Sequence, residues 1–455
     1  MNTSSLYIKN AKIVTSNGSI HGDLLMEEGK IKQIGTIKDN TASRTIDAKN
    51  QFVLPGGIDA HVHFKLKTKG IYTADDFESG SKAALAGGTT TIIDFVTPSN
   101  NQSLHQALES RKVEAAASYT DYAFHQSITH WNQNTEREMK EAVQQYGITS
   151  FKVYLAYQDT IGIDFSILEK VMEAASKLDA LVMIHAEVGE LIKELEDKVF
   201  DKQALLKHQL THPAKVEYMA IVKALELVEK TSCKTYFVHV STQKGIELIN
   251  NAKKKGLPVF AETCPQYFLF HDQSFRFDKD MEVYSIMSPP IRSINNKRAI
   301  FNAVSHRQFD CIHTDHCAFM KSQKMAQVNS YEDMPNGIGG VQQRLSLVLN
   351  EFVSSGILSW QDFALLTADR AAKIFGLPNK GSIKVGNDAD LVIYKENPKM
   401  VPLREYHDFS KSDIHIYANK KVRFIPDIVI KSGIVVFEDG IFKDPLPSGK
   451  YLQKN

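Results

Sequence analysis

Eight short apolar runs alternate with helical stretches through the middle of this 455-residue chain. Such alternation predicts β-α units around a parallel sheet. Eight units over about 320 residues fit an α/β fold of the (β/α)₈ or TIM-barrel type better than an open doubly wound sheet. No G-x-G-x-x-G follows an early strand, which weakens a dinucleotide-binding alternative. The runs are GIDAHVHF, TTTIIDFV, DYAFHQSI, SFKVYLAY, LVMIHAEV, TYFVHVST, PVFAETCP and CIHTDH.

The two ends of the chain have a different pattern. The first fifty and the last seventy-five or so residues alternate apolar and polar side chains around Gly and Asp turn signals. This pattern predicts antiparallel strands. We expect the two ends to pair into one small β domain, since one core rarely grows beyond roughly 300 residues.

Charge and hydropathy exclude several partners. Lys and Arg number 54 against 53 Asp and Glu, with no basic tract that could follow a phosphate backbone, so nucleic acid is not expected. No stretch of about 18 apolar residues predicts a membrane span or anchor, and no signal peptide is recognisable. The four cysteines form no C-x-x-C pair, which favours a reducing, cytoplasmic location.

Metal-ligand residue types lie at the C-terminal ends of five of the eight runs, where barrel enzymes carry their reactive groups. Residues i and i+2 of a strand point to the same side, so His61 and His63 can bind one ion together. Imidazole and carboxylate ligands suit Zn²⁺ and can leave a position open for water. The candidates are His61, His63, Lys152, His185, His239 and Asp315.

Other histidines receive no ligand role. An H-x-H pair alone is weakly diagnostic, and a single buried His is more often a hydrogen-bonded core residue. His125, His313 and His316 lie near strand ends, whereas His208, His212 and His407 fall on predicted helices or loops.

Lys152 lies in the apolar strand FKVYLAY, where a bare ammonium is costly to bury. One hypothesis is that the neutral amine reacts with carbon dioxide, giving a carbamate whose two oxygens bridge two cations. The alternative is that the side chain reaches solvent at the strand end. The strand alone does not decide between them.

Nine motifs together resemble the cyclic amidohydrolases of the dihydropyrimidinase and D-hydantoinase family. The resemblance runs from about residue 5 to 395, in the order and spacing of the family. The motifs are GGIDAHVHF (56–64), DDFESGSKAALAGGTTTIIDF (75–95), SFKVYLAY (150–157), IHAEVGE (184–190), FVHVST (237–242), ETCPQYF (262–268), SPPIR (288–292), TDHCAF (314–319) and PNGIGGVQQRL (335–345).

The resemblance implies a (β/α)₈ barrel beside a small β-sandwich built from both ends. The implied limits are 1–54 for the first part of the sandwich, 55–375 for the barrel, and 376–455 for the second part and the tail. It also implies zinc-dependent hydrolysis of a hydantoin or dihydropyrimidine ring to an N-carbamoyl amino acid by a metal-bridging hydroxide. Relatives are commonly homo-oligomers, so a tetramer or dimer is expected.

The family's site implies two Zn²⁺ per chain, with Mn²⁺ or Co²⁺ as substitutes. His61 and His63 would bind the first ion, and His185 and His239 the second. Carboxylated Lys152 would bridge the two ions.

The resemblance implies further roles for residues outside the histidine pairs. Asp315 would bind the first ion and act on the bridging hydroxide, and Tyr157 would stabilise the oxyanion. Ser288 and Asn336 would hold the cyclic amide, largely through backbone groups.

Three alternatives stay open. Allantoinase-like and dihydroorotase-like relatives follow their H-x-H with Arg-Glu-Pro or Asn-Glu-Pro, whereas this chain has Phe64-Lys65-Leu66-Lys67, which argues against those substrates. Non-catalytic dihydropyrimidinase-like interaction proteins lack the ligands, and here all six positions are filled. Lys65, Lys67 and Lys69 either form a solvated face or favour an anionic ring substituent.

Overall fold

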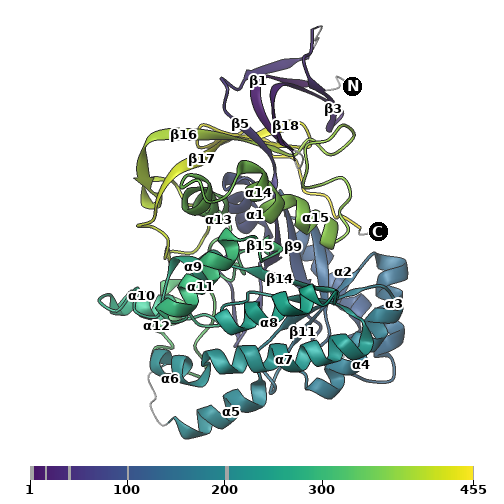
Figure 1. Cartoon of the computed structure of the whole chain (residues 1–455), viewed down its shortest axis with the longest axis vertical. Coiled ribbons are helices and arrows are strands. Elements are labelled where there is room, and N and C mark those ends of the chain that lie inside the picture. The colour runs from purple at the N-terminus through teal and green to yellow at the C-terminus, as the bar shows by residue number, and fades with distance from the viewer. Residues whose placement is uncertain (1–4, 16–17, 39–41, 100–101, 200–203, 454–455) are drawn as a thin grey trace.

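The computed structural model describes residues 5–15, 18–38, 42–99, 102–199 and 204–453. It has two parts, a helix-covered barrel and a β domain in which the first and last strands of the chain lie together (Figure 1). The predicted pairing of the two ends is therefore confirmed.

All eight apolar runs form strands of one parallel sheet, which confirms the predicted barrel. Each strand lies beside the strands that precede and follow it in this series, so the order in the sheet follows the order in the sequence. The strands are β6 (Gly57–Val62), β9 (Thr89–Val96), β10 (Asp121–Ser127), β11 (Ser150–Tyr154), β12 (Leu181–His185), β13 (Lys234–Phe237), β14 (Val259–Thr263) and β15 (Cys311–Ile312).

The residues after β15 close the barrel against β6. The Ala60 N–H donates to His313 Nδ1 over 3.2 Å, and the His63 N–H donates to the His316 carbonyl over 2.8 Å. A parallel bridge also joins Val62 to His316. Closure therefore places the H-x-H strand directly beside the segment that carries Asp315.

Helices cover the outside of the barrel (Figure 1). The helical stretches expected between the strands are present, and Asp164 caps α4 by accepting from the Ile167 N–H over 2.8 Å. The longer helices are α1 (Phe77–Ala86), α2 (Leu104–Ala115), α3 (Thr135–Tyr146), α4 (Phe165–Lys177), α5 (Gly189–Lys198), α6 (Ala204–Thr211), α7 (Ala214–Thr231), α8 (Gln243–Lys254) and α11 (Ile294–Ser305).

Shorter helical turns lie mainly in the second half of the chain. They are α9 (Pro265–Leu269), α10 (Lys279–Tyr284), α12 (Lys321–Met325), α13 (Arg344–Val348), α14 (Trp360–Ala364), α15 (Arg370–Ile374), two π-helical turns (Leu349–Val353 and Leu365–Asp369) and one 3₁₀ turn (Leu403–Glu405). No helix among the described residues is long and apolar enough to cross a membrane.

The β domain is one nine-stranded sheet whose order is β19-β18-β17-β16-β5-β1-β2-β3, with β4 beside β1. The two ends of the chain meet where β5 pairs antiparallel with β16, and strands from both ends bury side chains in one shared core. The strands are β1 (Leu6–Thr15), β2 (Gly18–Glu27), β3 (Lys30–Gly35), β4 (Arg44–Asp47), β5 (Phe52–Pro55), β16 (Leu391–Pro402), β17 (Lys421–Lys431), β18 (Ile434–Glu438) and β19 (Ile441–Phe442).

The last part of the chain also returns twice to the barrel. Between β16 and β17, the Lys411 N–H donates to Asp75 Oδ1 over 2.8 Å. The tail pairs with the start of β10, where the Leu452 N–H donates to the Tyr122 carbonyl over 2.7 Å. Segments assigned to the β domain by sequence therefore also support the barrel.

Candidate metal and substrate site

The six predicted metal ligands lie at one end of the barrel. Strand ends supply them directly: His61 is in β6, Lys152 in β11 and His185 is the last residue of β12. His239 follows β13 by two residues, and Asp315 follows β15 by three. In a parallel barrel these ends meet at the same face, which explains why distant residues converge.

The first group of ligands is preassembled around Asp315. Its Oδ1 lies 3.2 Å from His61 Nε2 and 3.0 Å from His63 Nε2. One ligand atom from each of the three residues lies within 4.8 Å of the others. Burial opposes ionisation of Asp315, but its contacts with His61 and His63 and the nearby Lys152 hold the pKa of this carboxyl below its usual value.

The second histidine pair lies beside the first group. The rings of His185 and His239 have centroids 4.6 Å apart, and the His239 ring is 5.5 Å from that of His61. Burial holds the pKa of His61 and of His239 well below the usual value. Both are therefore neutral imidazoles, the form that binds a metal ion.

Lys152 is buried, which contradicts the alternative that its side chain reaches solvent at the strand end. Its side chain is 1% exposed, and none of the described residues offers its Nζ a hydrogen-bond acceptor. The Nζ instead lies 5.3 Å from the centre of the Phe95 ring and 5.1 Å from that of Tyr154. Burial lowers the pKa of Lys152 to about 8, against the charges of Asp315 and Glu262.

These observations test whether the residues fit a pair of metal ions. The buried Lys152 amine lacks a hydrogen-bond partner among the described residues, and unsatisfied buried polar groups are costly. His61, His63 and Asp315 form one group of potential ligands, and the rings of His185 and His239 lie beside it. The set contains too many ligands for one tetrahedral ion. The residues therefore fit two cations.

Two glutamates orient the imidazoles, and the sequence analysis missed both. Glu262 contacts His61 Nδ1 and also accepts from the backbone N–H of His239 over 3.1 Å. Glu187 Oε2 lies 2.9 Å from His185 Nε2. Such carboxylates fix the ring orientation of metal-binding histidines. Their signal in the sequence is an acid beside a strand end, in the motifs ETCPQYF and IHAEVGE.

The three predicted substrate-binding residues form a chain beside His185. The Tyr157 ring lies 5.3 Å from the His185 ring, and the Tyr157 hydroxyl interacts with Ser288. Asn336 Nδ2 in turn donates to Ser288 Oγ over 3.2 Å. Burial raises the pKa of Tyr157, which keeps its phenol protonated as a hydrogen-bond donor.

Three residues of the site have left-handed backbone. The φ angles are +61° for Tyr157, +39° for His239 and +55° for Asp315. Such angles cost a non-glycine residue about 1 to 3 kcal/mol and persist where surrounding structure imposes them, commonly at functional sites. Eleven other described non-glycine residues also have positive φ, so such backbone is not confined to the site.

Comparison with known proteins agrees with this geometry. The model of the amidohydrolase family matches residues 52–436. The D-hydantoinase of Geobacillus stearothermophilus is 37% identical over 98% of this chain and 96% of its own length. The dihydropyrimidinase of Arabidopsis thaliana is 32% identical over 100% and 86%, respectively. The chain belongs to the amidohydrolase family.

Solved structures place this amidohydrolase among the cyclic amidohydrolases. The crystal structure of dihydropyrimidinase from Brevibacillus agri NCHU1002 has a TM-score of 0.95 and 30% sequence identity, covering 99% of this chain and 98% of that one. Structural similarity therefore continues past residue 395, beyond the range of the motifs that carry the resemblance in the sequence.

The remaining strand-end histidines of the amidohydrolase are hydrogen-bonded within the core. His125 lies 2.6 Å from Ser150 Oγ and 3.0 Å from the Ala60 carbonyl. His316 Nε2 lies 3.0 Å from Asp75, and its Nδ1 accepts from the Gly340 N–H over 3.1 Å. These partners agree with the absence of a ligand role for either residue.

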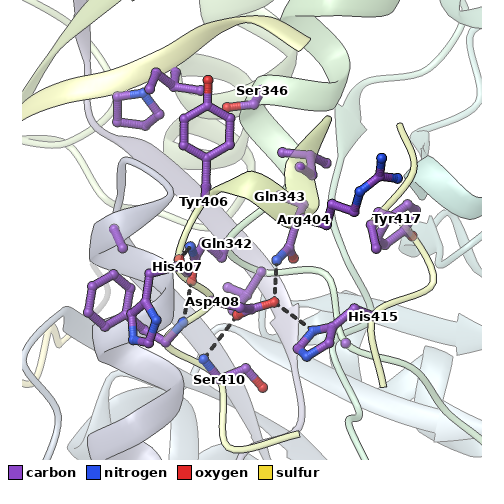
Figure 2. Close-up of a pocket in the computed structure, with 18 of the residues that line it drawn as sticks. Gln342, Gln343, Ser346, Arg404, Tyr406, His407, Asp408, Ser410, His415 and Tyr417 are labelled. Atoms are coloured by element: carbon purple, nitrogen blue, oxygen red, sulfur yellow. Dashed lines mark hydrogen bonds and ion pairs between the residues drawn. The ribbon is translucent and has the colours of Figure 1, made fainter. Parts of the chain in front are cut away.

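A separate cavity of about 760 Å³ lies beside the β16–β17 connection (Figure 2). None of the nine predicted site residues lines it. Asp408 is one of the lining residues, and its Oδ2 accepts from Gln343 Nε2 over 2.7 Å and lies 3.0 Å from His415 Nδ1 (Figure 2). His407 also lines this cavity.

Proposed function

We propose that this amidohydrolase opens a hydantoin or dihydropyrimidine ring to give an N-carbamoyl amino acid. The observation that carries the proposal is the full-length similarity to proteins named D-hydantoinase and dihydropyrimidinase, together with the group of potential metal ligands at His61, His63 and Asp315. In the reaction, the ring C–N bond breaks while water adds a hydroxyl group to the carbonyl carbon and a proton to the nitrogen.

Two Zn²⁺ would be held by this set, with Mn²⁺ or Co²⁺ as substitutes. His61 and His63 would bind one ion and His185 and His239 the other. Lys152 would bridge them as N6-carboxylysine, formed when its neutral amine attacks carbon dioxide and loses a proton. Bound zinc would supply an activated water and polarise the carbonyl under attack.

The protein's own groups would then direct the proton and the developing charge. Asp315 would take the proton released during the attack and pass it to the leaving ring nitrogen. Tyr157, which keeps its phenolic proton, would donate to the developing oxyanion. Ser288 and Asn336 would hold the ring, largely through backbone groups.

We further propose a cytoplasmic homo-oligomer, a tetramer or dimer, with domain limits near residues 54 and 375. The support is resemblance to enzymes that commonly assemble in this way. Light scattering at micromolar concentration tests the assembly, and a strict monomer would contradict it.

A substrate panel tests the activity. Protein loaded with zinc or manganese is assayed on hydantoin, 5-substituted hydantoins, dihydrouracil, allantoin and dihydroorotate. We expect turnover of hydantoins or dihydrouracil and little of the others. Preference for allantoin or dihydroorotate would reassign the substrate, and no turnover of any ring by metal-loaded protein would favour a non-catalytic role.

A further inference from the structure

Lys324 is a second fully buried lysine, and it lies outside the metal set. Its side chain is 0% exposed on the short helix α12. Unlike Lys152, its ammonium is satisfied: Nζ donates to the Tyr284 carbonyl over 2.9 Å and to the Ile286 carbonyl over 2.7 Å. None of the described carboxylates forms an ion pair with it, and burial lowers the pKa of Lys324 to about 7, so its amino group depends on these two backbone carbonyls.

The two carbonyls belong to the segment that leads directly to Ser288. The Ile286 carbonyl is shared, because it also accepts from the Gly337 N–H over 3.0 Å. Gly337 follows Asn336, whose side chain donates to Ser288. One carbonyl thus connects the Lys324 ammonium to both segments of the proposed ring-binding site.

The fit around Gly337 leaves little room for adjustment. A side chain at this position would meet the Cys317 carbonyl at 2.4 Å, and its φ is +151°. The Cys317 N–H also donates to the Ile338 carbonyl over 2.9 Å. The segment around Asn336 is therefore packed between Cys317 on one side and Ile286 on the other, and Lys324 bonds the Ile286 side.

We propose that Lys324 is a positioning residue, whose ammonium holds the segments of Ser288 and Asn336 at the separation that binds the substrate ring. This inference rests on the proposed function, since the ring is the ligand. It extends that function to a residue whose amino group bonds the backbone of the 284–286 segment and none of the proposed metal ligands.

Removal of the Lys324 amino group is expected to raise KM more than it lowers kcat. Lys324→Met keeps the length and apolar stem of the side chain, but it leaves the Tyr284 carbonyl without a donor and the Ile286 carbonyl with the Gly337 N–H alone. The freed segment shifts, and misplacement of binding groups by about 1 Å weakens catalysis by up to about 100-fold. Because Ser288 and Asn336 bind the ring before and during reaction, the loss falls mainly on KM.

The first experiment compares Lys324→Met with a matched control on the same helix. Lys321 is exposed, and its Nζ lies 5.9 Å from the Tyr284 ring, so Lys321→Met removes a lysine that contacts the same residue without bonding its carbonyl. We expect K324M to raise KM about tenfold or more with a smaller change in kcat and unchanged metal content. We expect K321M to match the parent protein.

A second measurement does not depend on activity. Hydrogen exchange of peptides covering 284–290 and 333–340 should accelerate in K324M and stay unchanged in K321M, at a temperature where both are folded. Should K324M fail to fold, Lys324→Gln, which retains an amide donor, takes its place in both experiments with a smaller expected effect.

The outcomes separate the two proposals. Faster local exchange in a protein that opens no ring would reject the proposed function while supporting the positioning of these segments. An active parent whose K324M variant keeps its KM would overturn the inference. Unchanged exchange at both segments, or loss of metal together with activity, would overturn it as well.

Discussion

The candidate site has two halves that are held in different ways. The metal half, defined as the six proposed ligands, comes from strand ends or the residues just after them, and its histidines and Asp315 lie against one another. The ring half, defined as Tyr157, Ser288 and Asn336, comes from loops and depends on contacts with groups outside the site. The metal half comprises His61, His63, Lys152, His185, His239 and Asp315.

The difference shows what each half needs from the rest of the fold. Barrel geometry brings parallel strand ends together whatever the loops do, so the metal half depends mainly on the sheet. The ring half depends on long-range contacts, such as those of Lys324 with the Tyr284 and Ile286 carbonyls. Substitutions in the metal half should therefore change metal content, and those in the ring half should change kinetics alone.

The largest expected effect belongs to Lys152→Ala. This variant removes the group proposed to bridge the two ions, so activity and most of the bound metal should be lost. Metal analysis and turnover measure both losses, and added short-chain carboxylates should restore part of the activity.

The matched control for this substitution is K324M. Lys324 is equally buried, but its loss should leave metal content unchanged. A fully metallated, active K152A protein would contradict the proposed bridging role of Lys152. Metal loss from both lysine variants would contradict the proposed difference between the two halves.

Tyr157→Phe tests the ring half with the next largest effect. The variant keeps the aromatic ring beside His185 but deletes the hydroxyl proposed to donate to the oxyanion. We expect kcat to fall about 100-fold at constant metal content. A matched control is Tyr154→Phe, whose ring lies 6.2 Å from that of Tyr157. An unchanged kcat in the Tyr157 variant would make that tyrosine a packing residue.

The sequence predicted the metal half far more fully than the interactions that support it. Apolar runs of four to eight residues define strands, and strands place His61 and His63 on one side, so the barrel and its polar end follow from local patterns. The contact of Glu262 with His61 joins residues 201 positions apart, and no local pattern encodes it.

The ring half could be nominated only by resemblance to a family. Ser288 and Asn336 lie in loops without periodicity, and their contact joins residues 48 positions apart. Lys324 has no distinctive local signal, because a lysine on a short polar helix is ordinarily exposed. Its burial depends on the close approach of the segment from Tyr284 to Ile286, which only tertiary packing produces.

Glu262→Gln should have a smaller effect within the metal half. The amide can still accept one hydrogen bond but no longer carries the charge that supports His61, so metal affinity should fall about tenfold. Metal retention against a chelator measures this affinity. Glu217→Gln is the matched control, because Glu217 is a buried carboxylate that bonds Ser241 and Thr242 instead of a histidine. Equal retention in both variants would contradict an orienting role for Glu262.

The smallest expected effect concerns the loop lysines. An extended loop would place Lys65, Lys67 and Lys69 on one side, but they have different partners. Lys65 lies 3.4 Å from Glu114, and the Lys67 ammonium lies 5.9 Å from the Tyr72 ring centre. Lys69 Nζ donates over 2.8 Å to the carbonyl of Met334, which precedes Asn336 of the ring half by two residues.

Lys69→Gln therefore tests whether the loop favours an anionic ring substituent. The neighbouring charges of Glu332 and Asp333 offset part of the lysine's attraction, and exposed charges are worth little. We expect the kcat/KM ratio of carboxyalkyl to alkyl hydantoins of equal length to fall about twofold, and the difference to shrink with added salt. Lys65→Gln is the control, because Lys65 pairs with Glu114. If the ratio is the same in both variants and the parent, the ring half distinguishes substituents without Lys69, and the loop lysines are surface charge alone.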